Sequence, residues 1–324
     1  MSMATPLSNV REVDLTNATW YQGSRYSYPL RGEHTNDTLA IVDICKRKGT
    51  EPPPHVHHRE HEVFVLLDAD VEFQASADRF TGRPGAVAFL PSGIPHRFAV
   101  QQPWGQFLVI VTPAGFDRYL APFSERATHL DEPPLPSGPP DIPALLARGA
   151  EFGIEFVPPN ADLASFPCNQ PDGLRPIVRQ DDEGELLDIL GVPVRVKLTS
   201  DESGGAMSIF VTNDPPRMGP PLHVHHKEDE TFYVIEGDYR ARVGGEELAL
   251  KQGQIAFIPR GVPHTYGNAG TTPGKLLVIT TPGGFEHFFR GIDSLCRAGK
   301  PSLDALIAVG GKHGIDFVGP PIFA

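Results

Sequence analysis

Short apolar runs dominate the hydrophobic pattern of this chain. The segments VFVLL (63–67) and TFYVI (231–235) are rich in β-branched and aromatic residues, which is typical of strands. Two further runs within 239–250 flank a Gly-Gly pair and predict a hairpin. The pattern therefore predicts a mostly antiparallel β protein. Helical spacing is confined to segments that lie late in each half of the chain: 116–123, 142–153, 285–292 and 303–311.

The chain contains an internal repeat. PPPHVHHREHE at 52–62 matches PPLHVHHKEDE at 220–230, and GAVAFLPSGIPH at 85–96 matches GQIAFIPRGVPH at 253–264. Both pairs are separated by the same 168 residues, so the order of elements is the same in the two halves. This duplication predicts two similar domains.

The repeat also predicts where the two domains meet. The proline-rich segment 131–143 has the composition of a linker, but it precedes GIEFVPP (153–159), a motif whose counterpart comes near the end of the second repeat. We therefore interpret 131–143 as a loop and expect the boundary to follow Pro159. The predicted domains are an N-terminal domain at 1–165 and a C-terminal domain at 166–324.

Four residues with metal-binding side chains recur in each half at matched spacing. In the second half, His223 and His225 alternate with Val224, so on a strand the two imidazoles share one face. Three imidazoles and one carboxylate suit a divalent first-row metal and leave coordination positions open. A lone HxH pair is common on protein surfaces, but a surface has little reason to keep four ligand types twice. The predicted metal ligands are His55, His57, Glu62 and His96 in the first half, and His223, His225, Glu230 and His264 in the second.

Composition and charge narrow the range of partners. The 33 glycines and 34 prolines suit many short strands joined by turns. A net charge of −12 without a basic cluster disfavours nucleic acid and anionic membrane surfaces. The start of the chain lacks the apolar run of a signal peptide, and the three cysteines show no CxxC pairing. We therefore expect a cytoplasmic protein with reduced thiols.

The two motifs resemble those of the cupin superfamily, GxxxxxHxHxxxxExxxxxxG and GxxxxxPxGxxHxxxN. The second half has the complete second motif, from Gly253 to Asn268, but Arg217 replaces the leading glycine of the first motif. The first half departs at Ala69 and Val100, where the motifs have glycine and asparagine. The resemblance implies an all-β bicupin: two tandem jelly-roll barrels with short C-terminal helices in each repeat.

The whole layout, including a TPxGF segment after the last barrel strand, is similar to quercetin 2,3-dioxygenases. In that family a flavonol binds the metal through its deprotonated 3-hydroxyl, dioxygen adds, and the heterocycle opens with release of carbon monoxide. The resemblance implies a metal-dependent dioxygenase that acts on a flavonol-like or other small aromatic enol substrate. Glu62 and Glu230 would then be catalytic, as metal ligands that also act as general bases.

Strand alternation predicts the walls of each cavity. It directs Phe98 inward from His96, and Tyr266 inward from His264. Apolar and aromatic walls suit an aromatic substrate better than a sugar phosphate, which would require arginine and lysine. A phenol near the metal could donate a hydrogen bond to substrate or oxygen, so we expect Tyr266 to be catalytic and the second domain to be the more active. The other residues predicted to face inward are Phe64, Leu66, Phe232 and Val234.

Four polar residues flank the predicted ligands. His58 and His226 directly follow the HxH pairs and should face away from the metal, so we expect them at the surface. Glu60 and Glu228 lie two residues before the ligand glutamates. They could be partners of a ligand imidazole, but we expect them to be exposed to solvent.

Other functions fit the same motifs, because cupins host many chemistries on one fold. A metal-dependent isomerase or cyclase would use the same four ligands without oxygen, and a non-enzymatic bicupin would only bind metal or ligand. The donor set is compatible with one iron, manganese, nickel, copper or cobalt ion per domain, and also with redox-inert zinc. Sheet edges in such barrels often pair, so a homodimer is one option.

Overall fold

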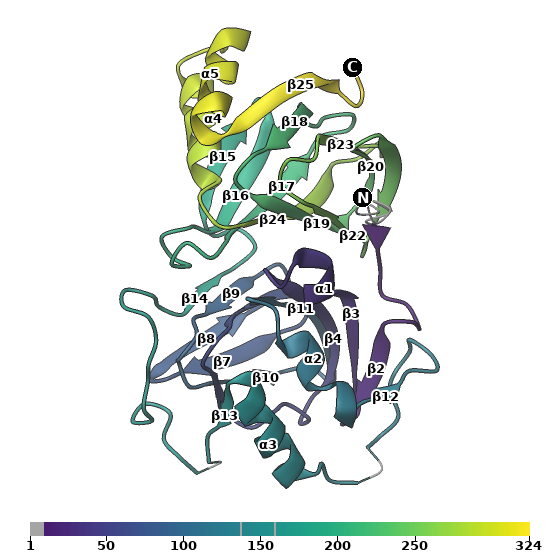
Figure 1. Ribbon diagram of the computed structural model, residues 1–324, viewed down its shortest axis with the longest axis vertical. Helices are drawn as coiled ribbons and strands as arrows, with labels where there is room; N and C mark the ends of the chain where they lie inside the picture. Colours follow the sequence, from purple (N-terminus) through teal and green to yellow (C-terminus); the bar gives the residue numbers. More distant parts are fainter. Residues whose placement is uncertain (1–9, 137, 159) are drawn as a thin grey trace, which may run out of the picture. The chain divides into compact units, whose positions relative to one another are not determined.

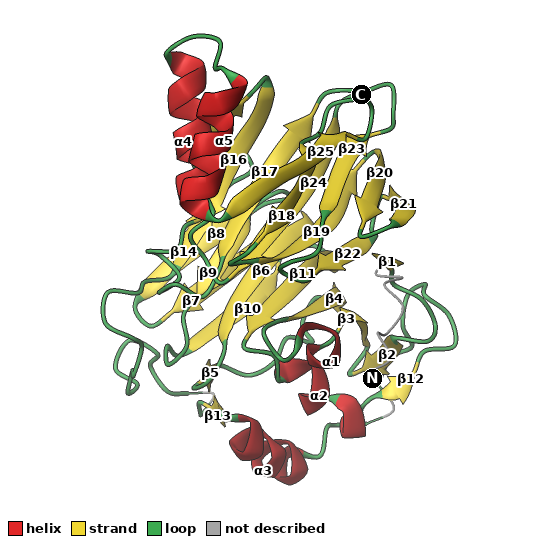
Figure 2. Cartoon of the chain, turned by 45° about the horizontal axis from the view of Figure 1, so that its top comes forward, coloured by secondary structure: helices red, strands yellow, loops and turns green. Residues whose placement is uncertain are grey.

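A computed structural model describes residues 10–136, 138–158 and 160–324. The start of the chain and Pro159, where the predicted domain boundary begins, lie outside the described residues. The chain divides into two compact units (Figure 1). The first unit is Val13–Glu183, and the second is Gly184–Ala324 together with residues 10–12. Strands are the main element of both units, as Figure 2 shows, which confirms the predicted all-β class with short helices.

The first unit, called the first barrel below, consists of two antiparallel sheets and a few short helices. Its larger sheet contains, in spatial order, Glu125–Arg126 (β12), Ala18–Tyr21 (β2), Ser24–Leu30 (β3), Ala40–Arg47 (β4), Trp104–Thr112 (β11), His61–Asp68 (β6), Val87–Leu90 (β9) and Ile177–Arg179 (β14). Its smaller sheet contains Ile154–Phe156 (β13), His55–His57 (β5), His96–Val100 (β10), Val71–Ala75 (β7) and Asp78–Gly82 (β8). Its helices are Gly32–Thr35 (α1), Phe116–Tyr119 (α2), Ala121–Phe123 (η1, a 3₁₀ helix) and Ile142–Phe152 (α3).

The core of the first barrel lies between its two sheets. The ring of Phe64 on β6 lies 5.2 Å from the rings of both Phe73 on β7 and Phe98 on β10, which belong to the other sheet. Two sheets that bury alternate residues against each other form a jelly roll. The alternation predicted for this half is confirmed, because Phe64, Leu66 and Phe98 all belong to this buried cluster.

The second unit, called the second barrel, repeats this arrangement. Its larger sheet contains, in spatial order, Val10–Arg11 (β1), Ile255–Ile258 (β22), Asp229–Glu236 (β19), Gly274–Thr281 (β24), Ser208–Asp214 (β17), Val192–Leu198 (β16) and Glu185–Ile189 (β15). Its smaller sheet contains Glu246–Lys251 (β21), Asp238–Val243 (β20), His264–Asn268 (β23), Pro221–His225 (β18) and Ile315–Pro321 (β25). Its helices are Glu286–Arg297 (α4) and Leu303–His313 (α5), which pack side by side (Figure 1).

The core of the second barrel again joins the two sheets. The ring of Phe232 on β19 lies 4.9 Å from the ring of Tyr266 on β23. Phe232 and Val234 are buried, and Tyr266 packs against the same cluster while keeping part of its surface exposed. The predicted hairpin is also confirmed: β20 and β21 are antiparallel partners on either side of the Gly-Gly turn.

The strand that precedes each sequence repeat belongs to the barrel that the other repeat forms. β1 pairs with β22 in the second barrel, with Val10 opposite Ala256. β14 pairs with β9 in the first barrel, with Val178 opposite Ala88. Val178 lies 168 positions after Val10, and Ala256 lies 168 positions after Ala88. The two repeats therefore exchange the same strand. The ranges 1–165 and 166–324 follow the sequence repeat. That they are the two domains stays a prediction.

Helices form at all four predicted segments, whereas the short helix α1 was not predicted. Helix α3 begins with the side chain of Asp141 accepting a hydrogen bond from the Ala144 amide at 3.1 Å, and it ends at Gly153 with φ = 75°. The predicted helix at 116–123 is instead split into α2 and η1, because Pro122 lacks the amide hydrogen that a continuous helix requires. Within the described ranges, no helix is long and apolar enough to cross a membrane.

Candidate metal centres

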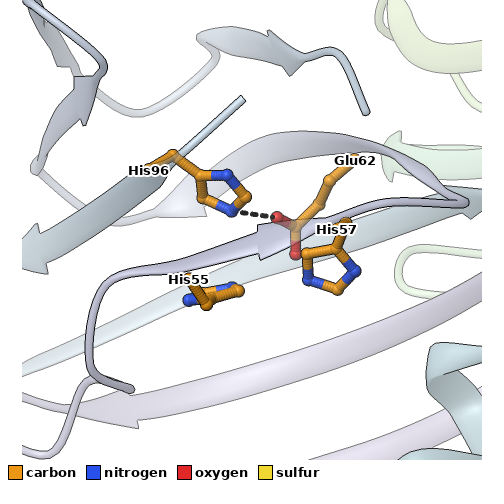
Figure 3. A group of neighbouring side chains, drawn as sticks. All are labelled: His55, His57, Glu62 and His96. Atoms are coloured by element: carbon orange, nitrogen blue, oxygen red, sulfur yellow. Dashed lines mark hydrogen bonds and ion pairs between the residues drawn. The ribbon is translucent and has the colours of Figure 1, made fainter. Parts of the chain in front are cut away.

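The four predicted ligands of the first half converge inside the first barrel (Figure 3). His55 and His57 stand at the two ends of β5, and His96 begins β10 directly opposite His55 in the ladder. Glu62 reaches the group from β6 in the other sheet. All four are buried, and one ligand atom from each lies within 4.8 Å of the others. The cluster therefore joins both sheets of the barrel at one point.

Backbone carbonyls fix the orientation of two of these imidazoles. The Nδ1–H of His55 donates to the carbonyl of Pro53 at 2.9 Å, and the Nδ1–H of His96 donates to the carbonyl of Ile94 at 3.0 Å. A carbonyl can only accept, so Nδ1 carries a hydrogen in both rings, and Nε2 is the nitrogen that can bind a metal. The Nε2 atom of His96 lies 3.1 Å from a carboxylate oxygen of Glu62. Hydrogen bonds from Nδ1 to a backbone carbonyl, as in His55 and His96, set the tautomer that a metal-binding imidazole needs.

Glu60 orients the third imidazole and is buried, so the expectation that it would be exposed to solvent is wrong. One oxygen of its carboxylate lies 2.8 Å from Nδ1 of His57 and the other accepts from the amide of Phe116 at 2.7 Å. A Cβ atom at Gly115 would clash with this carboxylate, which explains the glycine at this position of the first barrel. Glu60 therefore joins His57 to the chain that follows the last barrel strand.

The charges of the first cluster match those of a cation site. Burial disfavours the charged form of Glu62, but the hydrogen bond with His96 and the nearby imidazoles outweigh it and lower the pKa of Glu62 to about 2. Burial and the two neighbouring imidazoles lower the pKa of His55 to about 3. An ionised carboxylate beside neutral imidazoles is the protonation state in which these groups bind a metal.

The second cluster has the same construction. His223 and His225 lie on β18, Glu230 on β19 and His264 on β23, and their ligand atoms again lie within 4.8 Å of one another. His264 begins its strand opposite His223, as His96 does opposite His55. The Nε2 atom of His264 lies 2.8 Å from Glu230, whose pKa is about 2 because the imidazole interactions outweigh burial.

The two clusters differ at their second imidazole. The Nδ1 atom of His225 lies 3.7 Å from Glu228, beyond hydrogen-bonding distance. Glu228 is buried like Glu60, so the expected exposure is wrong here too. The ring of Phe285 packs 4.7 Å from the ring of His225. Among the residues that the structure describes, neither ring nitrogen of His225 has a hydrogen-bond partner.

The donor set of both clusters fits a divalent transition metal. The Nε2 atoms of His57 and His225 are buried and have no hydrogen-bond partner within the described part of the chain. A buried polar atom without a partner is costly, and a metal ion among three imidazoles and one carboxylate would remove that cost. The buried donors therefore support one transition metal in each barrel, without specifying the element.

A cavity of about 780 Å³ opens from the first cluster. His55, His57 and Glu62 line it together with the rings of Phe64 and Phe98, as strand alternation predicts. Most of its wall is apolar, which suits an aromatic ligand. The wall also contains Lys46 and Tyr26, which sequence reasoning missed. The alternation of β4 carried the signal, because Lys46 continues the inward-facing series Ala40, Val42 and Ile44.

The wall of the second barrel contains a different polar group. Asp214, which corresponds to Lys46 at the 168-residue offset, is buried on β17. Its carboxylate accepts hydrogen bonds from Thr212 at 2.6 Å and from Tyr239 at 2.8 Å. Tyr266 packs beside this group, 6.2 Å from the ring of Tyr239. Tyr266 thus packs against the core of the second barrel, and its catalytic role stays a prediction.

The histidines that follow the HxH pairs lie at the surface, as predicted. His58 pairs with Glu155, and His226 pairs with Asp316, each at 2.8 Å. All four side chains are exposed, so these pairs lie outside the two clusters.

Comparisons with known proteins agree with this geometry. The cupin domain family matches residues 45–103 and 210–280, the two segments that contain the clusters. Quercetin 2,3-dioxygenase of Bacillus subtilis is 26% identical over 265 residues, which cover 80% of this chain and 78% of that protein. The tetracenomycin polyketide synthase protein TcmJ of Streptomyces glaucescens is 32% identical over 87 residues, which cover 26% of this chain and 58% of that protein.

A solved structure shows the same two-barrel fold. The oxalate decarboxylase of Lactobacillus farciminis, solved as a formate complex, superposes with a TM-score of 0.60 over 87% of this chain and 88% of that one. Its sequence is 18% identical, so the similarity concerns the fold alone. The two segments that match the cupin domain family lie one in each barrel, and the chain is similar to a quercetin 2,3-dioxygenase over most of its length, so it resembles a bicupin of that kind.

Proposed function

We propose that this bicupin is a metal-dependent dioxygenase that acts on a flavonol-like or other aromatic enol substrate. The observation that carries the proposal is the buried cluster of three histidines and one glutamate that opens into the apolar cavity of the first barrel. The similarity to a quercetin 2,3-dioxygenase over most of the chain supports the same reaction class. The ligands would be His55, His57, Glu62 and His96 in one barrel, and His223, His225, Glu230 and His264 in the other.

The metal, when bound, supplies Lewis-acid activation of the enol oxygen and the redox chemistry that dioxygen requires. Glu62 and Glu230 would accept the enol proton, because each carboxylate lies among the ligand atoms of its cluster, next to the position that the enol oxygen would occupy. The rings of Phe64 and Phe98 hold the aromatic plane of the substrate and exclude water. Catalysis therefore combines a positioned carboxylate base with a dry aromatic cavity.

Tyr266 has a proposed role in the second barrel. Its ring lies 4.9 Å from the ring of Phe232 in the core of the barrel, and burial raises the pKa of its hydroxyl well above the ordinary value. The hydroxyl therefore stays protonated at neutral pH and can donate a hydrogen bond to bound substrate or oxygen. The first barrel has Phe98 at this position, so we propose that the second barrel is the more active.

Elemental analysis followed by an oxygen electrode tests the proposal. Protein loaded separately with iron, manganese, nickel, copper, cobalt or zinc is offered 3-hydroxyflavone and quercetin, and oxygen uptake and carbon monoxide release are measured. We expect metal-dependent uptake of oxygen with the redox-active ions. Absence of uptake with every metal and both flavonols would reject the dioxygenase.

A metal-dependent isomerase or cyclase is the second candidate. It would use the same ligands, and the similarity to a polyketide synthase protein over part of the chain favours it over other non-oxidative functions. Conversion of an aromatic polyketide under strict anaerobiosis, including by the zinc-loaded protein, would favour this candidate. A third option, binding of metal or ligand without catalysis, would be favoured by bound metal with neither reaction.

A further inference from the structure

The first barrel holds a buried lysine that the proposed reaction does not use. Lys46 is the last inward-facing residue of β4 and is 1% exposed, among the apolar residues of the barrel core. Its Nζ donates to the Tyr26 hydroxyl at 3.0 Å. Within the described residues, this is the one hydrogen-bond partner of the Lys46 side chain. The charge of Glu51, which lines the same cavity, only partly offsets the burial of Lys46. Burial of a cation with one hydrogen-bond partner is costly, which points to a further partner outside the chain.

The two side chains together present several donors to the cavity. An ammonium group has three N–H donors, and the hydrogen bond to Tyr26 uses one. The Tyr26 hydroxyl accepts from Lys46, so its own hydrogen is left to donate. Burial raises the pKa of Tyr26, which keeps this hydrogen in place at neutral pH. An oxygen anion at this position would receive hydrogen bonds from both residues.

This donor pair and the metal ligands line the same cavity but stand at different levels of the barrel. Along β11, Glu62 is level with Val111, whereas Lys46 is level with Gly105. Apolar and aromatic side chains, including Phe64, Phe98 and Ile44, line the wall of this cavity. A ligand that reached both polar ends would need a flat apolar body and an acceptor group at the end away from the metal.

The second barrel reverses the charge at this point. Asp214 replaces Lys46, and Tyr239 donates to it. A carboxylate ligand would meet a buried acid there instead of a cation, which disfavours binding. The two cavities therefore differ in the charge that they accept.

We infer that the cavity of the first barrel binds aromatic compounds that carry a carboxylate, which Lys46 and Tyr26 hold at the end away from the metal. This inference rests on the proposed function and adds a carboxylate to the substrate proposed for the first barrel. The second barrel, with Asp214 at the same position, takes compounds without one. Lys46 and Tyr26 are positioning residues that select the substrate.

The test uses binding to metal-free protein, so that it does not depend on turnover. The probes are biphenyl-4-carboxylate and its neutral analogue biphenyl-4-methanol, titrated by calorimetry at about pH 6, where Lys46, with a pKa of about 7, is protonated. We expect the carboxylate to bind about tenfold more tightly or better, because it gains charge-assisted hydrogen bonds. The net charge of −12 works against adventitious binding of the anion.

Lys46→Met should abolish this preference, and Lys46→Arg should keep part of it. Lys48→Met is the matched control, because Lys48 carries the same charge on the exposed surface near the end of the same strand. Lys46→Gln and Tyr26→Phe provide second variants if the Met variant does not fold. Equal affinity of the two probes for the unmodified protein, or an unchanged preference in Lys46→Met, would overturn the inference.

A second pair of measurements separates this inference from the proposed dioxygenase. Zinc-loaded protein is titrated with 3-hydroxyflavone, which carries the metal-binding enol but no carboxylate. Loss of 3-hydroxyflavone binding with retained biphenyl-4-carboxylate binding would reject the flavonol-like substrate and leave the Lys46 site standing. Binding of 3-hydroxyflavone without binding of biphenyl-4-carboxylate would reject the Lys46 site and leave the proposed dioxygenase unaffected.

Discussion

In the first barrel the carboxylate of Glu60 lies 2.8 Å from the imidazole of His57, whereas in the second barrel Glu228 lies 3.7 Å from the equivalent His225. The four ligands themselves are the same in both barrels. Away from the cluster, the first barrel has the buried Lys46 where the second has the buried Asp214. The two copies therefore share the four residues that could hold a metal and differ in what surrounds them, and we propose one type of reaction on two kinds of ligand.

The largest expected effect comes from the ligand glutamates. Glu62→Ala and Glu230→Ala each remove a metal ligand and a base, and a base of this kind contributes about 10²–10⁴-fold to turnover. We expect Glu230→Ala to cause the greater loss of oxygen uptake, because the second barrel is proposed to be the more active. Oxygen-electrode rates for the two variants and their double variant measure each contribution. Full activity in Glu230→Ala with loss in Glu62→Ala would reverse the assignment of the barrels.

The opposite charges of Lys46 and Asp214 predict opposite pH dependence of stability. Burial, partly offset by Glu51, lowers the pKa of Lys46 from 10.5 to about 7, so between these values the unfolded chain binds more protons than the folded chain. Stability therefore rises with pH across this window. Burial of the charged lysine lowers the free energy of unfolding by about 5 kcal/mol below pH 7 and has no effect above pH 10.5. Lys46→Met removes this penalty.

Asp214 gives the reverse case in the second barrel. Burial outweighs the hydrogen bonds from Thr212 and Tyr239 and raises its pKa from 3.8 to about 6, so between these values the folded chain binds more protons. Its contribution to stability falls as the pH rises through this window, and the penalty of about 3 kcal/mol is complete above pH 6. The free energy of unfolding of Asp214→Asn, compared with that of the unmodified protein, should therefore rise from pH 4 to pH 7.

Urea denaturation of the metal-free variants and unmodified protein, compared at each pH, measures both effects. From about pH 4 to 7, the relative stability of Lys46→Met should stay constant while that of Asp214→Asn rises. Parallel pH curves for the two variants would contradict the difference in charge between the two cavities.

A smaller effect is expected at the residues that orient the second imidazole. Glu60→Gln should weaken metal binding in the first barrel by about 10–100-fold, because it replaces the charged partner of His57. Glu228→Gln should have a weaker effect, since its carboxylate is beyond hydrogen-bonding distance of His225. Competition with a chromophoric chelator gives both metal affinities. Equal losses in the two variants would show that the longer distance has no energetic consequence.

The smallest expected effect is at the aromatic position of each cavity. Tyr266→Phe removes one hydrogen-bond donor and should lower kcat of the second barrel by about tenfold, since one such bond contributes about 1 kcal/mol or more. Phe98→Tyr adds the hydroxyl to the first barrel as a matched change. Measurements of kcat and KM for flavonol turnover distinguish a role in the transition state from one in substrate binding. An unchanged kcat in Tyr266→Phe would remove Tyr266 from the catalytic group.

The sequence was sufficient to predict the duplicated β architecture and the convergence of the ligands. The reason is physical: an HxH pair on a strand places two imidazoles on one face, and the repeat identifies the other two ligands. Glu60 was predicted wrongly because it lies in the loop before β6, where strand alternation does not apply. Repetition of a glutamate at positions 60 and 228 was the available signal.

Other features depend on contacts between distant parts of the chain. The pairing of β1 with β22 and of β14 with β9 joins segments that follow no local pattern. Lys46 ends an alternating strand, where a lysine ordinarily extends to solvent, so its burial could not be predicted from its position alone.

The metal content of each barrel is the most direct test of the account. Protein loaded with excess metal, desalted and analysed by elemental spectrometry should retain about two ions per chain, one for each set of three histidines and one glutamate. His96→Ala and His264→Ala should each retain about one ion. Retention of no ion by the unmodified protein, or of two by either variant, would contradict the central claim.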